Sequence, residues 1–180
     1  MANHNRTDQG GVSLIESMIV LFVLSIVIGT AIPSLRSLSQ RADVAGAAAQ
    51  LETDVHFARS QARALNRTVR LTLLEAGGGT CYIVHTGAAA DCNCGVGHPA
   101  PACSGDSELL RAVVLDPKGE VQVRSASEVV TFDPFRGTVT PTATLRVEGR
   151  DGRAIHQVVN LLGRVRSCSP QGRSMGEAAC

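Results

Sequence analysis

Apolar and polar positions divide the chain into parts with different periods. Residues 1–11 are polar, and residues 12–32 form a nearly unbroken apolar run in which Glu16 is the only charged residue. At about 1.5 Å of rise per residue, a helix over this run spans a hydrocarbon layer roughly 30 Å thick. The run therefore predicts a transmembrane segment. Proline removes a backbone donor, so we expect Pro33 to bend the helix that continues beyond it.

From residue 33 to about residue 65, apolar residues recur in steps of four and three, which is typical of a helix with one buried face. The stripe consists of Val44, Ala48, Leu51, Val55, Ala58, Ala62 and Leu65. The charged residues left for the solvated side are Arg41, Glu52, Arg59, Arg63 and Arg67. The apolar stripe is short and rich in alanine, which favours packing of the helix on a sheet over a coiled coil. The pattern predicts one long helix over residues 12–65.

Beyond residue 66 the period changes to two, which is typical of half-buried strands. Strands are predicted at residues 69–73, 81–85, 109–115, 121–124, 129–132, 143–147 and 154–161, with turns at 77–79, 116–119 and 149–152. Residues 86–108 have no regular pattern, and we expect them to form a loop held by disulfides. The order of elements predicts an α+β fold, with the long N-terminal helix packed on an antiparallel β-sheet domain over residues 66–180.

The composition limits the number of domains and the residues available for the core, but it does not indicate a binding partner. A chain of 180 residues fits one globular domain in addition to the helix. With four Phe, one Tyr and no Trp, the core must be built from Val, Leu, Ile and Ala. The net charge is +1, and Lys118 is the only lysine among 17 basic residues. Genomic base composition explains such a use of arginine as well as a binding role does.

Six cysteines, an even number in a chain with an export signal, indicate disulfides in an oxidising compartment. They are Cys81, Cys92, Cys94, Cys103, Cys168 and Cys180. Fifteen connectivities are open, of which Cys168 with Cys180 is the simplest pair. A zinc site at Cys92, Cys94, His98 and Cys103 is the alternative, but the first two cysteines are closer in sequence than zinc sites usually require. We therefore expect no metal.

The start of the apolar run differs from an ordinary secretory signal, whose cleavage site follows the apolar region. Here the small residues Gly10 and Gly11 precede it. Cleavage after Gly11 would create an amine on Val12, and that amine could neutralise the carboxylate of Glu16. A plain single-pass anchor explains the length of the run, but it leaves a costly intramembrane charge without a purpose.

The sequence GVSLIE (residues 11–16) followed by an apolar helix resembles the class III signal of type IV pilins and type II secretion pseudopilins. The resemblance implies that a prepilin peptidase removes the leader, residues 1–11, and N-methylates Val12, which stands where the family usually has Phe. It implies that Glu16 sets register against a neighbouring subunit and that Pro33 bends the helix. It also implies an inner-membrane protein with a periplasmic domain, which later joins other pilins and minor pilins at the cell surface.

At the other end of the chain, two arginines follow a glycine. Side chains alternate along a strand, so the sequence Gly163-Arg164-Val165-Arg166 places both guanidinium groups on one face. Two arginines with this spacing can bind phosphates. Charges that protect an edge strand from aggregation are the alternative, and spacing alone favours it. Residues 136–180 carry Arg136, Arg146, Arg150, Arg153, Arg164, Arg166 and Arg173 against Glu148, Asp151 and Glu177.

Three stretches are similar to the GspH/FimT family of minor pilins: ARSQAR (residues 58–63), VTFDPFRG (residues 130–137) and GRVR (residues 163–166). In competence-associated members, a GRxR motif and nearby basic residues bind DNA. Carried over, this implies Gly163, Arg164 and Arg166, with Arg173 as a neighbour in sequence. Pilins commonly have a C-terminal disulfide loop, which supports the pair Cys168 and Cys180.

The resemblance predicts a minor pilin of a type IV pilus that binds DNA non-specifically during natural transformation. Few aromatic residues are present for stacking on bases, so we expect double-stranded DNA. A GspH-like minor pseudopilin of a type II secretion system is the alternative, and a cell-surface adhesion module that uses residues 86–108 is a third. The chain has no GxSxG, P-loop, HExxH or CxxC motif, so we expect neither an enzyme nor a cofactor.

Overall fold

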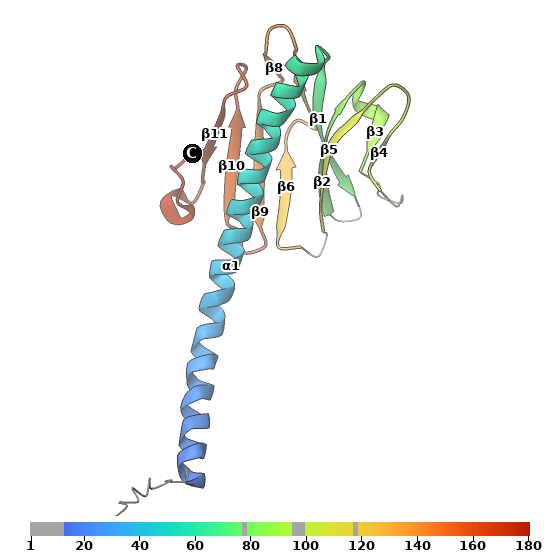
Figure 1. Cartoon of the computed structure of the whole chain (residues 1–180). Helices are drawn as coiled ribbons and strands as arrows, with labels where there is room; N and C mark the ends of the chain where they lie inside the picture. Colours follow the sequence, from blue (N-terminus) through green and yellow to red (C-terminus); the bar gives the residue numbers. More distant parts are fainter. Residues whose placement is uncertain (1–12, 77–78, 95–99, 117–118) are drawn as a thin grey trace, which may run out of the picture. The chain divides into compact units, whose positions relative to one another are not determined.

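The computed structural model of the chain describes residues 13–76, 79–94, 100–116 and 119–180 (Figure 1). Its first element is one continuous helix, α1 (Leu14–Leu65), as the apolar pattern predicts. Two compact units divide the chain, Met1–Ser39 and Gln40–Cys180, and α1 contributes to both. The predicted processing residues Gly11 and Val12 lie outside the described residues, as do Gly77 and Gly78 of the predicted turn.

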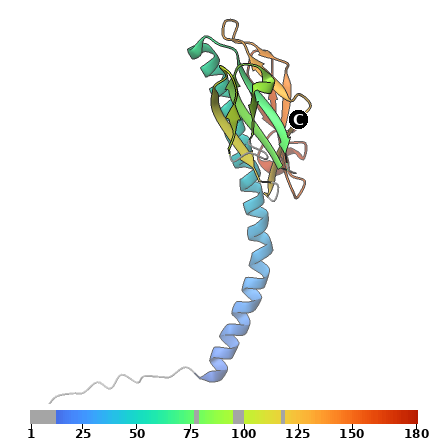
Figure 2. The same ribbon diagram turned by 90° about the vertical axis from the view of Figure 1, so that its right-hand side faces the viewer.

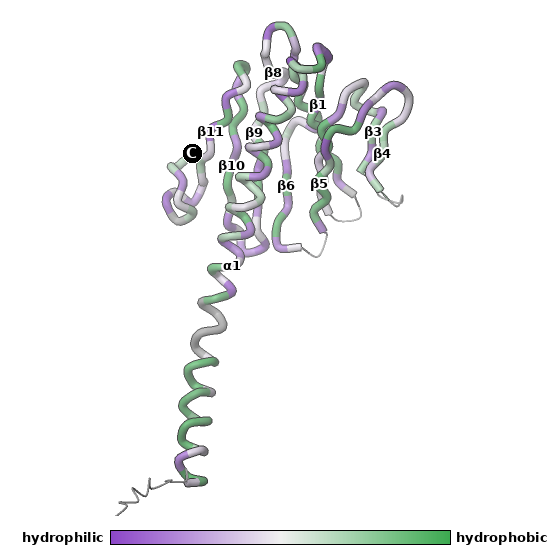
Figure 3. Tube along the Cα trace, in the orientation of Figure 1, coloured by the Kyte–Doolittle hydropathy of each residue, from purple (hydrophilic) through white to green (hydrophobic). Residues whose placement is uncertain are grey.

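In the first unit, α1 begins with a capped turn and then exposes its apolar side chains. Ser13 precedes the first helical residue, and its hydroxyl accepts a hydrogen bond from the N–H of Glu16 at 3.3 Å, so Ser13 is the N-cap. Glu16 lies in the first turn, where a negative charge is favourable at the positive end of the helix dipole. Further along, large apolar residues such as Phe22 are more than half exposed. Figure 3 shows the hydrophobic character of this part of α1.

Within the part of the chain that the structure describes, no helical stretch is both long enough and apolar enough to cross a membrane. The predicted transmembrane segment, residues 12–32, is therefore not confirmed. That segment includes Val12, which lies outside the described residues, and residues 30–32, whose side chains are not described. The side chain of Pro33 is not described either, and the bend expected there stays a prediction.

In the second unit, α1 packs one face on the strands (Figure 2). Six of the seven residues of the predicted stripe are buried, namely Val44, Ala48, Leu51, Val55, Ala58 and Ala62. The prediction is wrong for Leu65, which is 37% exposed. A heptad stripe drifts by about 20° per repeat around a straight helix, and three repeats turn the last position away from the face that begins at Val44.

The end of α1 has the hydrogen bonds of a Schellman motif. Asn66 has a positive φ of 50°, and its N–H donates to the carbonyl of Arg63 at 3.3 Å. The N–H of Arg67 donates to the carbonyl of Ala62 at 3.2 Å. These bonds satisfy the last carbonyls of the helix and turn the chain into the first strand.

The strands form two main antiparallel sheets where the sequence predicts one antiparallel sheet. The five-stranded sheet has the order β5 (Leu109–Leu115), β2 (Gly79–Thr86), β1 (Val69–Ala76), β7 (Val129–Phe132) and β8 (Val139–Thr140). The four-stranded sheet has the order β11 (Val165–Cys168), β10 (Ala154–Val159), β9 (Ala143–Gly149) and β6 (Val121–Ser125). The sheets meet where the N–H of Val123 on β6 donates to the hydroxyl of Thr80 on β2 at 3.0 Å. The predicted α+β arrangement of a long helix on antiparallel strands is confirmed.

Residues 86–108 contain more structure than the predicted loop. They include a 3₁₀ helix, η1 (Ala89–Asp91), and a small hairpin of β3 (Cys92–Asn93) and β4 (Ala102–Cys103). A second 3₁₀ helix, η2 (Gly172–Met175), lies near the C-terminus. The predicted strand 154–161 ends early, at Val159, because the next residues form a tight turn.

Candidate nucleic-acid interface

The turn between β10 and β11 is built around the side chain of Asn160. Its Oδ1 accepts hydrogen bonds from the N–H groups of Leu162 at 3.0 Å and Arg164 at 2.9 Å. The N–H of Gly163 donates to the carbonyl of Asn160 at 2.9 Å, and Gly163 has a positive φ of 69°. Such a φ is the reason for a glycine at the start of the GRVR sequence. Leu161 and Leu162 are left exposed at the tip.

Arg164 directly precedes β11, the edge strand of the four-stranded sheet, and Arg166 is the second residue of that strand. Both are exposed, whereas Val165 between them packs against the core. Because side chains alternate along a strand, the two arginines share the outward face. Neither guanidinium forms a hydrogen bond or an ion pair with a residue that the structure describes. The arrangement presents two unneutralised positive charges on an accessible edge.

A third arginine lies behind the turn. A Cβ at Gly163 would lie 3.0 Å from Cδ of Arg59 and 3.1 Å from Cγ2 of Val139, so only glycine leaves room for the Arg59 side chain. The Nε of Arg59 is buried and has no hydrogen-bond partner in the described part of the chain. The prediction that Arg59 lies on the solvated side of α1 is therefore wrong: its side chain is half-buried beneath the β10–β11 turn.

Arg173 lies at the other end of β10 from Gly163. It belongs to η2, whose N-cap is Gln171. The Gln171 side chain accepts the N–H of Ala154 at 3.2 Å and donates to the carbonyl of Gly152 at 2.7 Å. Ala154 begins β10, whereas Gly163 follows its end. The structure therefore does not bring Arg173 together with the other three predicted DNA-binding residues.

The structure pairs all six cysteines, as Cys81–Cys94, Cys92–Cys103 and Cys168–Cys180. The third pair is the one that the sequence offers as the simplest. Cys81–Cys94 attaches the end of β3 to β2, and Cys92–Cys103 joins β3 to β4, where the two cysteines are direct partners across the hairpin. Zinc binds cysteine as a thiolate, and Cys92, Cys94 and Cys103 are all in disulfides, so none of the three cysteines of the zinc alternative is free to bind a metal. Its remaining ligand, His98, lies outside the described residues.

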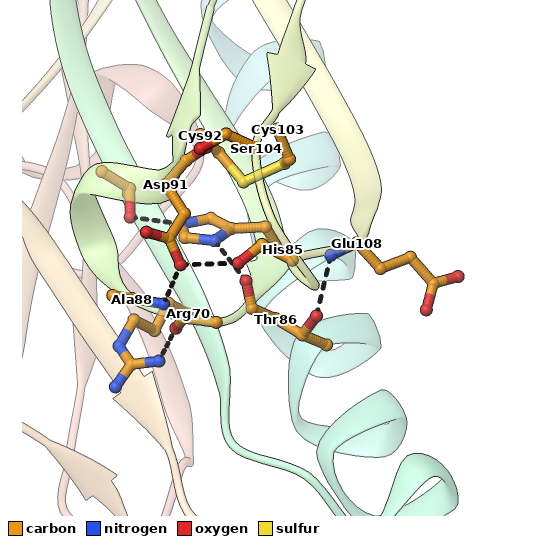
Figure 4. Close-up of a disulfide and its surroundings, with 12 residues drawn as sticks. Arg70, His85, Thr86, Ala88, Asp91, Cys92, Cys103, Ser104 and Glu108 are labelled. Atoms are coloured by element: carbon orange, nitrogen blue, oxygen red, sulfur yellow. Dashed lines mark hydrogen bonds between the residues drawn. A yellow bond between two sulfur atoms is a disulfide. The ribbon is translucent and has the colours of Figure 1, made fainter.

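Hydrogen bonds around Asp91 fix the corner that leads into this hairpin (Figure 4). The Asp91 carboxylate accepts the hydroxyl of Ser107 at 2.6 Å and the N–H of Ala88 at 2.7 Å. These two bonds, with the Ser107 bond contributing more, hold the pKa of the Asp91 carboxyl below its usual range. Arg70 donates from its guanidinium to the carbonyl of Gly87. The segment 86–108, which the sequence predicts to be a loop held by disulfides, is thus held by polar contacts as well.

His85 at the end of β2 is buried, and both of its ring nitrogens have partners (Figure 4). Its Nδ1 lies 2.9 Å from the carbonyl of Thr86, which only a protonated Nδ1 can use as a partner. Its Nε2 then accepts the hydroxyl of Thr72 at 2.8 Å. Burial favours this neutral ring and lowers the pKa of His85.

The predictions from sequence do not include a buried carboxylate on α1, that of Asp54. Asp54 is fully buried between the helix and the strands, where its carboxylate accepts the hydroxyl of Tyr82 at 2.8 Å and the amide of Gln50 at 3.1 Å. Arg111 on β5 completes the set with a short ion pair and stacks 4.7 Å above the ring of Phe57. Burial and the bond to Asp54 raise the pKa of Tyr82. An acidic residue beside the buried Val55 is the available signal in the sequence.

A long N-terminal helix with an exposed apolar first part, carrying a domain of antiparallel strands stapled by disulfides, defines a type IV pilin-like protein. The family model of the type II transport protein GspH matches residues 47–163, and the prokaryotic N-terminal methylation motif matches residues 6–32. The chain therefore belongs to the GspH family, as the sequence predicts. Arg164 and Arg166 follow directly after the residues that the GspH model matches.

Two crystal forms of the type IV minor pilin FimU from Pseudomonas aeruginosa (strain PAO1) are similar in structure. One is 20% identical, covers 74% of this chain and 97% of FimU, and has a TM-score of 0.49. The other is 21% identical, covers 70% and 96%, and has a TM-score of 0.45. No curated protein sequence matches the chain significantly.

Proposed function

We propose that this protein is a minor pilin of a type IV pilus, a structural and assembly component. A prepilin peptidase cleaves it after Gly11 and methylates Val12, and residues 12–32 anchor it in the inner membrane with its domain in the periplasm until it joins other pilins. The methylation motif over residues 6–32 and the exposed apolar side chains of α1 support this course. Glu16 sets register in the filament, and Pro33 allows the helix to bend there.

Replacing Glu16 separates processing from assembly. A Glu16→Ala variant keeps the glycine at the cleavage site, so the leader is removed as in the wild type. The variant lacks the carboxylate that meets a neighbouring N-terminal amine, so it is absent from sheared filaments. Immunoblots of membranes and filaments measure both steps, and normal incorporation of the variant would contradict the role of Glu16.

We further propose that the domain binds double-stranded DNA non-specifically through Arg164 and Arg166. The observation that carries this proposal is the pair of exposed arginines at the start of β11, one directly before the strand and one on it, without an acidic partner among the described residues. Guanidinium groups bind phosphate oxygens through paired hydrogen bonds. An edge strand can lie along a DNA backbone without obstruction from a neighbouring strand.

An electrophoretic shift of a duplex by the purified full-length chain tests DNA binding. The Arg164→Ala/Arg166→Ala variant is compared with Arg124→Ala/Arg150→Ala, which removes the same charge from arginines that have partners. We expect at least about tenfold weaker binding for the first variant, which corresponds to the loss of about 1.4 kcal/mol. The control variant binds like the wild type. Equal shifts from all three proteins would remove DNA from the function.

A minor pseudopilin of a type II secretion system is the second candidate, and the description of the matching family model as a type II transport protein favours it. The two functions differ in the assembly that holds the protein. Purification of an affinity-tagged chain from its native cells identifies either major pilins or secretion components. Recovery of secretion components alone would replace the pilus in the proposal.

A further inference from the structure

Arg59 carries a buried polar atom that the fold leaves unsatisfied. Its Nε is shielded from solvent and has no hydrogen-bond acceptor among the described residues. Leaving a buried donor unpaired destabilises the folded state, and native structures rarely contain such a group without a reason. The two Nη nitrogens of Arg59 are not buried in this way, and they too have no partner in the described part of the chain. The Nε side of the guanidinium therefore points into the protein, and the two Nη nitrogens lie at the surface.

Two segments lie near this side chain. Gly163 in the β10–β11 turn lies against it, and Val139 on β8 lies against the same glycine. The N–H of Val139 donates to the carbonyl of Leu161 at 2.8 Å, which joins β8 to the same turn. The next residue along the chain is Arg164, whose Cα is about 3.8 Å from that of Gly163. Arg59 thus lies beneath the start of the proposed DNA-binding edge.

Arg63 repeats the arrangement one turn further along α1. It lies against Gly137, which has a positive φ of 64° and follows the exposed Arg136 in the β7–β8 loop. Arginines four residues apart are neighbours on a helix surface and repel each other. Each of the two helix arginines therefore lies against a glycine turn that carries another exposed arginine.

The acidic side chains on the adjoining segments are already engaged. The Oδ1 of Asp133 accepts the N–H groups of Phe135 at 2.9 Å and Arg136 at 2.7 Å, which closes the β7–β8 loop. Glu52 on α1 accepts the hydroxyl of Ser167 at 3.4 Å. Positive charge at this end of the domain thus exceeds the negative charge on the segments that form it.

From this geometry we infer that Arg59 and Arg63 form a phosphate-binding site together with Arg164. The ligand class is a phosphodiester group, bound by the open Nη nitrogens of Arg59 at the mouth of the β10–β11 turn. The site deepens the proposed function, because it gives DNA bound along β11 a fixed anchor on α1. The Arg59 side chain is packed against Gly163 and its Nε is buried, so little side-chain freedom is lost when a phosphate binds.

Substitution of Arg59 by lysine tests the site while keeping the positive charge and the aliphatic stem. Lysine cannot form the paired hydrogen bonds of a guanidinium. We expect Arg59→Lys to weaken duplex binding by the full-length chain about fivefold, as measured by fluorescence anisotropy. Arg41→Lys, an exposed arginine on the same helix, is the matched control and binds like the wild type. Unchanged binding by Arg59→Lys together with weaker binding by Arg164→Ala/Arg166→Ala would overturn the Arg59 site and leave the proposed function intact.

A second measurement needs neither a variant that folds nor DNA. Inorganic phosphate is titrated into the isotope-labelled wild-type chain, and the Nε–H resonances of the arginines are followed by NMR. We expect the Arg59 resonance to shift in a saturable way while that of Arg41 stays unchanged. A shift without any duplex binding would keep the anion site and reject DNA as its ligand. No shift at Arg59 would overturn the site, whatever the duplex does.

Discussion

Arg111 on β5 and Arg59 on α1 are both partly buried arginines, but their guanidinium groups have opposite surroundings. Arg111 reaches the buried carboxylate of Asp54 and stacks on Phe57. Arg59 lies only two residues beyond Phe57 in the sequence, yet its buried Nε meets no acceptor that the structure describes. The first arginine completes a satisfied network between the helix and the strands. The second keeps its charge available for an anion that comes from outside.

The protein thus uses arginine in two ways, as a partner of a buried carboxylate and as an unneutralised charge. A buried carboxylate needs partners, and Asp54 has them from three elements, so this region contributes to stability and has no spare charge. The arginines around Gly163 have no acid to neutralise them in the described chain, so they add little to stability. We therefore expect substitutions in the first region to change unfolding, and substitutions in the second to change binding.

The largest effect on stability is expected at Asp54. Asp54→Ala leaves the hydroxyl of Tyr82 and the guanidinium of Arg111 without their shared acceptor. We expect a loss of about 2–3 kcal/mol in the free energy of unfolding, less than for a fully buried ion pair because Arg111 is 38% exposed. Urea denaturation of the full-length chain measures it.

Glu148→Ala is the control for Asp54, because it breaks the exposed ion pair with Arg124. Such pairs are worth less than about 1 kcal/mol. DNA binding by the Asp54 variant stays at the wild-type level under conditions where it is folded. Equal losses of stability from both variants would remove the distinction between buried and exposed partners.

A smaller loss is expected at Gly163, where the two regions meet. Gly163→Ala forces a side chain into a positive φ and places its Cβ 3.0 Å from Arg59. We expect about 1–2 kcal/mol of destabilisation, together with weaker duplex binding. Gly152→Ala has a similar φ of 81° with nothing within 4 Å, so it shows the backbone contribution alone. If the two variants unfold at the same urea concentration, the contact with Arg59 is not what selects glycine.

The smallest effect is a dependence of stability on pH at His85. Burial holds its folded pKa below the ordinary value of 6.5, so the unfolded chain takes up this proton first as the pH falls. The contribution of His85 is complete above about pH 6.5 and decreases as the pH falls towards the lowered value. Urea midpoints at about pH 7.5 and pH 5.5 measure the change for the wild type and His85→Gln.

His156 needs its own variant in this experiment. Burial also lowers the pKa of His156, so its contribution to stability falls in the same direction. Comparison with His156→Gln assigns each part of the change. A wild-type dependence that His85→Gln leaves unaltered would show that the satisfied ring of His85 is not its source.

Periodicity predicts much of this fold, because burial of one face imposes a regular spacing. Val44 and Ala62 lie where the stripe places them, and β5 and β7 have their predicted bounds. Leu65 fails because a strict heptad drifts around a straight helix. The β3–β4 hairpin could not be predicted, because its pairing follows the Cys92–Cys103 disulfide and no alternation in sequence marks it.

The polar sites were harder to predict than the core. Asp54 is buried because Tyr82 and Arg111, far away in sequence, converge on it, and no local pattern encodes that meeting. Arg59 has a helical position that looks solvated, and only the β10–β11 turn covers it. Arg173 is near Arg166 in sequence, but it lies beyond the end of β11, within the loop closed by the Cys168–Cys180 disulfide.

The central claim is that the unpaired arginines of β11 bind the DNA backbone, and the salt dependence of binding tests it most directly. Each phosphate contact contributes about 0.9 to the slope of log K against log salt concentration for duplex DNA. We predict that Arg164→Ala/Arg166→Ala lowers the magnitude of this slope by about 2 relative to the wild type, whereas Arg124→Ala/Arg150→Ala leaves it unchanged. If the wild type and the Arg164→Ala/Arg166→Ala variant have the same affinity and the same slope of log K against log salt concentration, the claim is contradicted.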